Sequence, residues 1–172
     1  YLDSVYETKM LAGYNVYVHT PDDYEQTGRH AAVWGRDIRW LGDMDAIIAH
    51  VKRHGYILTL HWHWFYDEQS AWTRKRETPA DVGKMVTPGT PAHKQVMKEL
   101  AAAADTLQKL EEADVPVLWR PLHEIDGGWF WWTDKENPQN TAKLWRLMFD
   151  YFTHERELDN LIWVYSAGVG NK

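Results

Sequence analysis

Short apolar runs alternate with amphipathic stretches along almost the whole chain. The runs are rich in aliphatic, β-branched and aromatic residues and are bounded by turn-forming residues, which is typical of buried strands. We therefore expect five strands, at 9–14, 31–35, 56–64, 115–122 and 161–166. Single strands that alternate with helices are typical of βα units built around a parallel sheet.

Three helices are predicted between these strands. The first runs from Met44 and is expected to end at Gly55, a residue that readily adopts the backbone conformation found at helix ends. The second and third open at Thr90-Pro91 and Asn137-Pro138, since proline is favoured in the first turn. The apolar sides of the three helices carry Met44, Ile47, Ile48 and Val51; Val96, Leu100, Ala103, Leu107 and Leu110; and Leu144, Met148, Tyr151 and Phe152. The polar stretch 65–89 is predicted to be a long loop, a length that is uncommon without a function.

The order of these elements predicts an α/β fold of the (β/α)₈ TIM-barrel type. No glycine-rich phosphate loop follows the first strand, and no internal repeat is present. A complete barrel takes about 250 residues, so five strands in 172 residues correspond to about the first five βα units. We expect residues 1–172 to be the N-terminal part of a single barrel domain, with no second domain.

Composition and charge exclude several classes of protein. Hydrophobic residues make up 44% and charged residues 26% of the chain, as in ordinary globular domains. No apolar run reaches the roughly 18 residues that a membrane span needs. The net charge of −6, without a basic stripe, argues against nucleic acid as a partner. The absence of cysteine excludes disulfides and thiolate metal sites.

The aromatic content is high, at 14% of the residues with 11 Trp and 9 Tyr. Trp and Tyr combine a flat apolar face with a polar edge, which suits the apolar face and the hydroxyl groups of a sugar ring. An aromatic-rich core is the alternative explanation. Clusters around Trp62 and Trp64 and around Trp129, Trp131 and Trp132 favour sugar binding because they adjoin ionisable residues.

Ionisable residues follow three of the predicted strands. Asp37 ends the second strand, His61 and His63 end the third, and Arg120 to Glu124 end the fourth. Barrel active sites lie at the carboxyl ends of the strands. A partly dry site favours the neutral form of a carboxyl group such as Glu124, as a general acid requires. The alternative is a structural Arg120–Glu124 ion pair.

The two histidines of the third strand also allow a metal site. Residues i and i+2 of a strand point the same way, so His61 and His63 would converge, with His123, Glu124 and Asp126 nearby. The alternative is that both histidines hydrogen-bond a substrate or a catalytic carboxylate. We favour that alternative and expect no metal, since no further spaced ligand set completes a site.

The run from Val117 to Trp132, VLWRPLHEIDGGWFWW, resembles the signature of glycoside hydrolase family 26. The segments 58–64, 32–37 and 161–166 resemble the third, second and fifth strands of that family. Its members are mostly endo-β-1,4-mannanases on a (β/α)₈ barrel. The resemblance extends over nearly the whole chain and implies the same fold and a related activity.

The resemblance also implies roles for single residues. Glu124 corresponds to the catalytic acid/base, and His123 would lie beside the catalytic carboxylates. Trp129 would form part of the sugar platform, His63 would line the same subsite, and Tyr165 would contact the nucleophile. The full set of expected substrate-binding residues is His63, Trp129, Trp64, Arg120, Tyr165, Trp132 and Asp37.

Two departures from the family pattern affect the expected chemistry. The family usually reads His-Glu-Met-Asn where this chain has His123-Glu124-Ile125-Asp126. If the Asp126 carboxylate lies close to Glu124, its negative charge would favour the neutral form of Glu124 further. The alternative is that the Asp126 side chain faces water. The family's nucleophilic Glu follows the seventh strand, which would lie beyond Lys172, so the chain alone is expected to lack it.

The function expected from the sequence is that of a retaining, cofactor-free β-mannanase. Its substrate would be β-mannan or a related plant cell-wall polysaccharide, and the resemblance implies a secreted, periplasmic or cell-surface location. The alternative is a truncated, non-hydrolytic glycan-binding protein. Its open sheet edges would require a partner or self-association. A metal-dependent hydrolase is a third possibility, which sensitivity to a chelator would reveal.

Overall fold

Five parallel strands form one sheet in the computed structural model, which describes residues 2–16 and 28–168. Neighbouring strands pair in the order β1-β2-β3-β4-β5, as in a barrel wound in one direction. The strands are β1 (Gly13–Asn15), β2 (Val33–Asp37), β3 (Ile57–His61), β4 (Val117–Arg120) and β5 (Leu161–Trp163). The predicted partial barrel with five βα-type strands is therefore confirmed.

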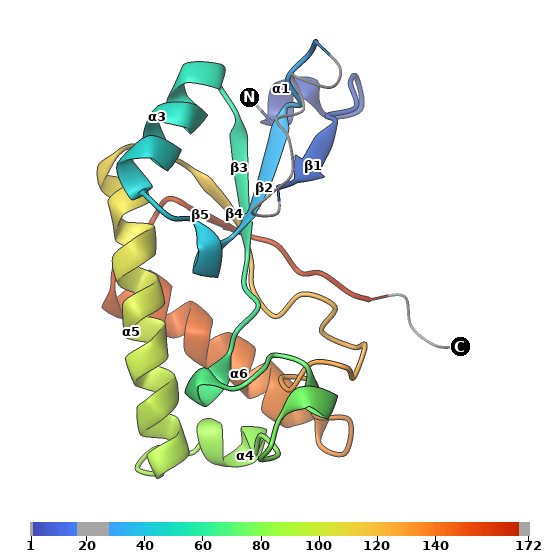
Figure 1. Ribbon diagram of the computed structural model, residues 1–172, viewed down its shortest axis with the longest axis vertical. Helices are drawn as coiled ribbons and strands as arrows, with labels where there is room; N and C mark the ends of the chain where they lie inside the picture. Colours follow the sequence, from blue (N-terminus) through green and yellow to red (C-terminus); the bar gives the residue numbers. More distant parts are fainter. Residues whose placement is uncertain (1, 17–27, 169–172) are drawn as a thin grey trace.

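The register of the sheet aligns the ends of three strands. Asp37 of β2 pairs with His61 of β3, and His61 in turn pairs with Arg120 of β4. Because the strands are parallel, the residues that follow them leave the sheet at the same edge (Figure 1). This register brings the ionisable groups together.

Three long helices connect the strands. They are α3 (Met44–His54), α5 (Pro91–Glu112) and α6 (Pro138–Asp150), which continues as a π-helical turn, η4 (Tyr151–Glu155). Asp43 caps the start of α3 and Gly55 ends it with a φ of 66°. Thr90 caps α5 by accepting a hydrogen bond from the backbone N–H of His93. The predicted helix starts are confirmed, and Figure 1 shows α3 and α5 on the same side of the strands.

The stretch 65–89 differs from the predicted plain loop. It contains two 3₁₀ turns and a short helix: η2 (Tyr66–Glu68), η3 (Thr73–Lys75) and α4 (Val82–Met85). Asp81 stabilises the last of these by accepting a hydrogen bond from the backbone N–H of Lys84. Another short helix, α1 (Leu2–Val5), lies near the N-terminus, and a 3₁₀ turn, η1 (Ile38–Trp40), follows β2.

The core lies between the sheet and the long helices. Leu58, Leu60, Val117 and Trp119 of the central strands are completely buried. The apolar side of α5 packs into the same cluster, through Val96, Leu100, Ala103, Leu107 and Leu110. Burying a side chain of this size stabilises the fold by about 1.5–3 kcal/mol. The helix periodicity read from the sequence therefore identifies the buried side correctly.

The observed strands are shorter than the apolar runs that predict them. The run 56–64 is a strand only to His61, where pairing with Arg120 ends. Pro121 follows Arg120 and has no backbone N–H to continue the ladder. The chain from Trp62 onward is thereby released to build the region beyond the sheet edge.

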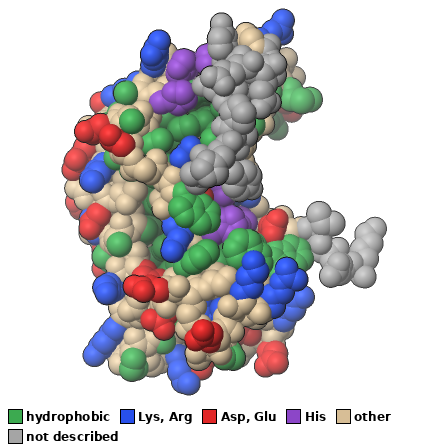
Figure 2. All heavy atoms as spheres, viewed as in Figure 1, with side chains coloured by type: hydrophobic (Ala, Val, Ile, Leu, Met, Phe, Trp, Pro, Cys, Tyr) green, Lys and Arg blue, Asp and Glu red, His purple; other side chains and the backbone are tan. Residues whose placement is uncertain are grey.

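Histidine side chains gather at two places on the face shown in Figure 2, one near the top and one in the hollow at mid-height. Near α3, His54 contacts both His30 and His50, beside Tyr56. None of the helices in the described parts of the chain is both long and apolar enough to cross a membrane.

Candidate active site

Asp37 and His63 form a tight pair at the end of β2. The Asp37 Oδ2 atom accepts hydrogen bonds from the backbone N–H and from the ring Nδ1 of His63, at 2.9 and 2.6 Å. The Oδ1 atom accepts the backbone N–H of Arg39 at 2.9 Å and caps η1. Asp37 is only 5% exposed. The carboxylate faces His63, and the expected substrate contact of Asp37 stays a prediction.

Burial and neighbouring charges determine the protonation states of Asp37, His61 and His123. Burial alone would raise the pKa of Asp37, but hydrogen bonds from His63 and from the Arg39 and His63 backbones outweigh it and lower the pKa. Burial lowers the pKa of His61 to about 4, although the nearby Asp37 charge opposes the shift. Burial, together with His63 and His61, lowers the pKa of His123 to about 3. His61 and His123 are therefore neutral near pH 7, beside an ionised Asp37.

Glu124 lies four residues past β4 in an unusual backbone conformation. Both Leu122 and Glu124 have positive φ, 46° and 52°. Holding a residue other than glycine in this left-handed backbone region costs about 1–3 kcal/mol of conformational free energy, and such strained residues cluster at functional sites. The Glu124 Oε2 atom accepts a hydrogen bond from the Trp129 indole at 2.5 Å. The structure therefore brings the predicted acid/base and the predicted platform together.

Three rings pack against His63 and form an aromatic wall: Trp72, His123 and Phe130. The His63 ring stacks on Trp72 with centroids 5.0 Å apart, and it meets His123 edge-on at 4.6 Å. Phe130 contacts both His63 and His123. The sequence reasoning missed Trp72 and Phe130 as parts of the site. An isolated Trp within the polar stretch 65–89 was the available signal for Trp72.

Two loops meet in this wall. Trp72 and Phe130 form an isolated antiparallel bridge. The backbone N–H of Thr73 donates to the Trp129 carbonyl at 2.8 Å, and that of Trp131 donates to the Ala71 carbonyl at 3.0 Å. The loop that follows β3 is thus joined to the loop that follows β4, directly beside Glu124.

Trp64 and Trp132 are buried, and the Trp132 ring stacks on Phe130 with centroids 4.4 Å apart. They are 1% and 0% exposed, so other side chains cover their rings. Trp64 stacks on Trp62 and donates from its indole to Glu99, while the Trp132 indole donates to the His123 carbonyl at 3.2 Å. Both rings are therefore buried, and the expected role of these two residues in substrate binding stays a prediction.

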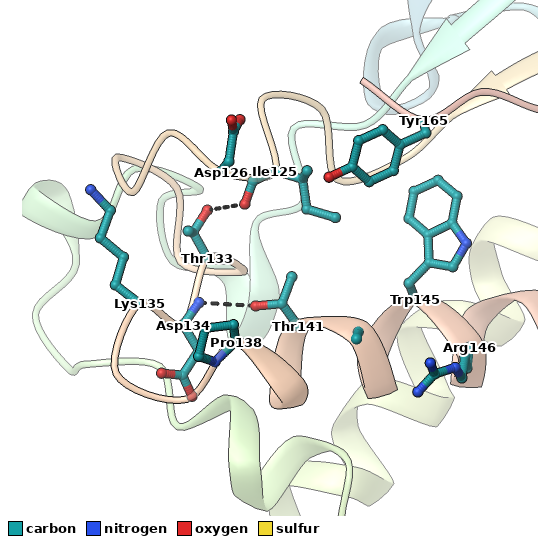
Figure 3. Close-up of a pocket in the computed structure, with 11 residues that line it drawn as sticks. Ile125, Asp126, Thr133, Asp134, Lys135, Pro138, Thr141, Trp145, Arg146 and Tyr165 are labelled. Carbon is teal, nitrogen blue, oxygen red and sulfur yellow. Dashed lines mark hydrogen bonds between the residues drawn. The ribbon is translucent and has the colours of Figure 1, made fainter. Parts of the chain in front are cut away.

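Tyr165 lines a cavity whose lining residues do not include His63. It is 67% exposed and contacts the ring of Trp145. The two line a cavity of about 630 Å³ with Ile125, Asp126 and Thr133 (Figure 3). Asp126 is exposed and accepts the backbone N–H of Gly168 at 2.5 Å, as expected if it faces water. Arg120 donates to the Ser166 hydroxyl at 3.2 Å.

Within the described residues, Asp37, His61 and His63 are the group whose donor atoms are close enough for a metal ion, all within 4.8 Å. The 2.6 Å contact between His63 Nδ1 and Asp37 Oδ2 is a hydrogen-bond distance, with a proton between the two atoms. A direct hydrogen bond therefore accounts for the contact between Asp37 and His63, whereas His61 Nε2 lies 3.5 Å from Asp37 Oδ2.

A parallel βα sheet with a carboxyl group, histidines and aromatic rings at its carboxyl edge defines the class of TIM-barrel-type domains with a candidate active site at that edge. The model of glycosyl hydrolase family 26 matches residues 1–170, and the chain belongs to this family.

Relatives and solved structures agree with this assignment. A mannan endo-1,4-β-mannosidase of Thermothelomyces thermophilus is 32% identical, over 97% of this chain and 39% of the relative. The crystal structure of a Podospora anserina β-(1,4)-mannanase is 32% identical, with a TM-score of 0.82 over 95% of this chain and 41% of that one. A β-mannanase from a symbiotic protist of the termite Reticulitermes speratus, complexed with gluco-manno-oligosaccharide, has 31% identity and a TM-score of 0.82. That match covers 98% of this chain and 60% of the other. The chain thus spans less than two thirds of the length of these proteins.

Proposed function

We propose that the protein containing this chain is a retaining glycosidase that cleaves β-1,4-mannosidic linkages, with Glu124 as the acid/base. The observation that carries the proposal is the position of the Glu124 carboxylate. It follows β4 in a left-handed backbone conformation and accepts a hydrogen bond from Trp129 beside an aromatic wall. Two names among the relatives, mannan endo-1,4-β-mannosidase and β-(1,4)-mannanase, support the choice of substrate.

In the proposed mechanism, Glu124 protonates the glycosidic oxygen as the bond to the leaving sugar breaks. A second carboxylate, about 5–5.5 Å away, attacks the anomeric carbon, and Glu124 then takes a proton from the water that releases the sugar. Among the described acidic residues next to Glu124 and His63, Asp37 is turned toward His63 and Asp126 is only two residues from Glu124. Neither suits the role of nucleophile, which the family resemblance places beyond Lys172.

Trp72 of the aromatic wall and the neighbouring Trp129 supply the proposed sugar contacts. Trp129 and Trp72 are partly exposed and adjoin Glu124 and His63, respectively. An indole face stacks on the apolar face of a sugar, while an imidazole nitrogen hydrogen-bonds a hydroxyl. Action on plant cell-wall polysaccharide would also require export, so the secreted or cell-surface location remains a prediction.

The test is Glu124→Gln in the full-length protein. We expect turnover on mannan to fall by about 10²–10⁴-fold, because the amide cannot donate the proton that the leaving group needs. An aryl glycoside with a good leaving group needs less proton donation and should lose less in its first step. The matched control is Glu136→Gln, at an exposed carboxylate in the loop before α6.

Near-normal mannan hydrolysis by Glu124→Gln would remove this residue from the mechanism. If the wild-type full-length protein bound mannan without cleaving it, the non-hydrolytic glycan-binding alternative would replace the proposal.

A further inference from the structure

The buried carboxylate of Asp37 has no direct place in the proposed mechanism, although it sits at the catalytic edge. It is 5% exposed, whereas the His63 side chain remains 12% exposed. We infer that Asp37 is a positioning residue that fixes His63 with its Nε2 atom available as a hydrogen-bond acceptor for a substrate hydroxyl. The inference rests on the proposed function, which it deepens.

The Asp37 carboxylate is held from two sides. Its Oδ1 atom accepts the Arg39 N–H, and its Oδ2 atom accepts the His63 N–H, both at 2.9 Å. Each donor belongs to the backbone of a segment that leaves the sheet next to a paired strand. The carboxylate therefore has little freedom to rotate, and Oδ2 is aimed at the His63 ring.

The His63 ring is held just as firmly. Trp72 stacks on it with an angle of 22° between the ring planes, and His123 packs edge-on at 75°. Phe130 contacts a further part of the ring at 5.7 Å between centroids. Because the Nδ1 atom faces Asp37, the Nε2 atom lies on the other side of the ring, away from the carboxylate.

The chemistry of the pair determines the tautomer of His63. An ionised carboxylate can only accept hydrogen bonds, and the lowered pKa of Asp37 keeps it ionised. The 2.6 Å bond therefore requires the proton on Nδ1. In the neutral ring, Nε2 then has a lone pair and accepts from a hydroxyl group. The ligand class is a sugar hydroxyl that donates at this point.

The inference is tested in the full-length protein with Asp37→Asn. Asparagine caps helical turns as well as aspartate does, so η1 should persist, while the amide no longer favours a proton on Nδ1. We expect kcat/KM on mannan to fall by about 10- to 100-fold, the range known for hydrogen-bond partners that orient a metal-binding histidine. The loss should not add to that of His63→Gln in the double variant, because both changes remove one interaction.

A long-range ¹H–¹⁵N spectrum reads the His63 tautomer directly. The wild type should show the Nδ1–H form, and Asp37→Asn should shift His63 toward the Nε2–H form. Asp43→Asn is the matched control, since Asp43 caps α3 in the same way, by accepting from Asp45 and Ala46. It should change neither the tautomer nor kcat/KM.

Additive kinetic losses, or an unchanged His63 tautomer in Asp37→Asn, would overturn the inference. The spectrum separates this failure from failure of the proposed function. A wild-type protein that does not cleave mannan but has His63 in the Nδ1–H form would refute the activity alone and support the positioning of the ring by Asp37.

Discussion

Mild acid should destabilise the fold through the two buried histidines His61 and His123. The side chains of both are neutral in the folded protein, with pKa values of about 4 and about 3 because burial disfavours the charged form. In the unfolded chain, a histidine has a pKa of about 6.5. As the pH falls below this value, the unfolded chain takes up protons that the folded protein does not, so the unfolded state gains stability.

The magnitude follows from the two pKa values. Each pH unit between the unfolded and folded pKa changes the free energy of unfolding by about 1.4 kcal/mol for each group. Between pH 6.5 and pH 5, each histidine should thus cost about 2 kcal/mol, and the pair about 4 kcal/mol. Asp37 acts in a lower window, because the stability from its depressed pKa is lost only as the pH falls below the ordinary aspartate value.

The assay is urea unfolding of the full-length protein at pH 7 and pH 5. His61→Gln removes one titrating group, so the difference between the two free energies should shrink by about 2 kcal/mol relative to the wild type. His154→Gln, at a largely exposed histidine on η4, is the control and should leave the difference unchanged. If the wild type and His61→Gln lost the same stability on acidification, the assignment of a neutral, buried His61 would be wrong.

Two further predictions follow from the same region. A direct hydrogen bond joins Asp37 and His63, so we expect no metal ion between them. Activity on mannan should therefore survive EDTA, and elemental analysis should find no stoichiometric divalent ion. Activity that is lost with EDTA and restored by a metal would contradict this prediction. Glu99→Ala removes the acceptor for the Trp64 indole and for Asp67 N–H at 2.9 Å, so urea unfolding should show a loss of about 1–3 kcal/mol. Glu136→Ala, at an exposed carboxylate, should change stability by no more than about 0.5 kcal/mol, and an equal loss in both variants would refute the role of Glu99.

The sequence predicts the helices well because their signals are local. Thr90-Pro91 and Gly55 mark helix ends through their own backbone preferences, and the apolar side of α5 repeats with the helical period. The gathering of Asp37, His63 and Glu124 at one edge was also predictable. It requires only that the strands be parallel and that each functional residue follow its strand.

The remaining features of the site depend on packing that no local pattern contains. Trp64 and Trp132 resemble sugar-stacking residues in the sequence, yet Trp62 and Trp131 pack against the Trp64 ring and Phe130 stacks on that of Trp132. Tyr165 follows β5 as Glu124 follows β4, but its ring packs against Trp145 of α6. The sequence predicts the edge at which Asp37 lies but not its pairing with His63, because a 2.6 Å contact depends on side-chain positions rather than on spacing.

Because the bridge between Trp72 and Phe130 joins the loops that follow β3 and β4, the lengths and sequences of the two loops cannot change independently. A change of length in either loop would pull on the partner and shift Trp129, whose carbonyl accepts from Thr73. A chimera that takes only one of the two loops from a related protein would therefore lose the bridge and the backbone hydrogen bonds that join the loops. A redesign of this site should therefore exchange the segments 65–75 and 123–133 together.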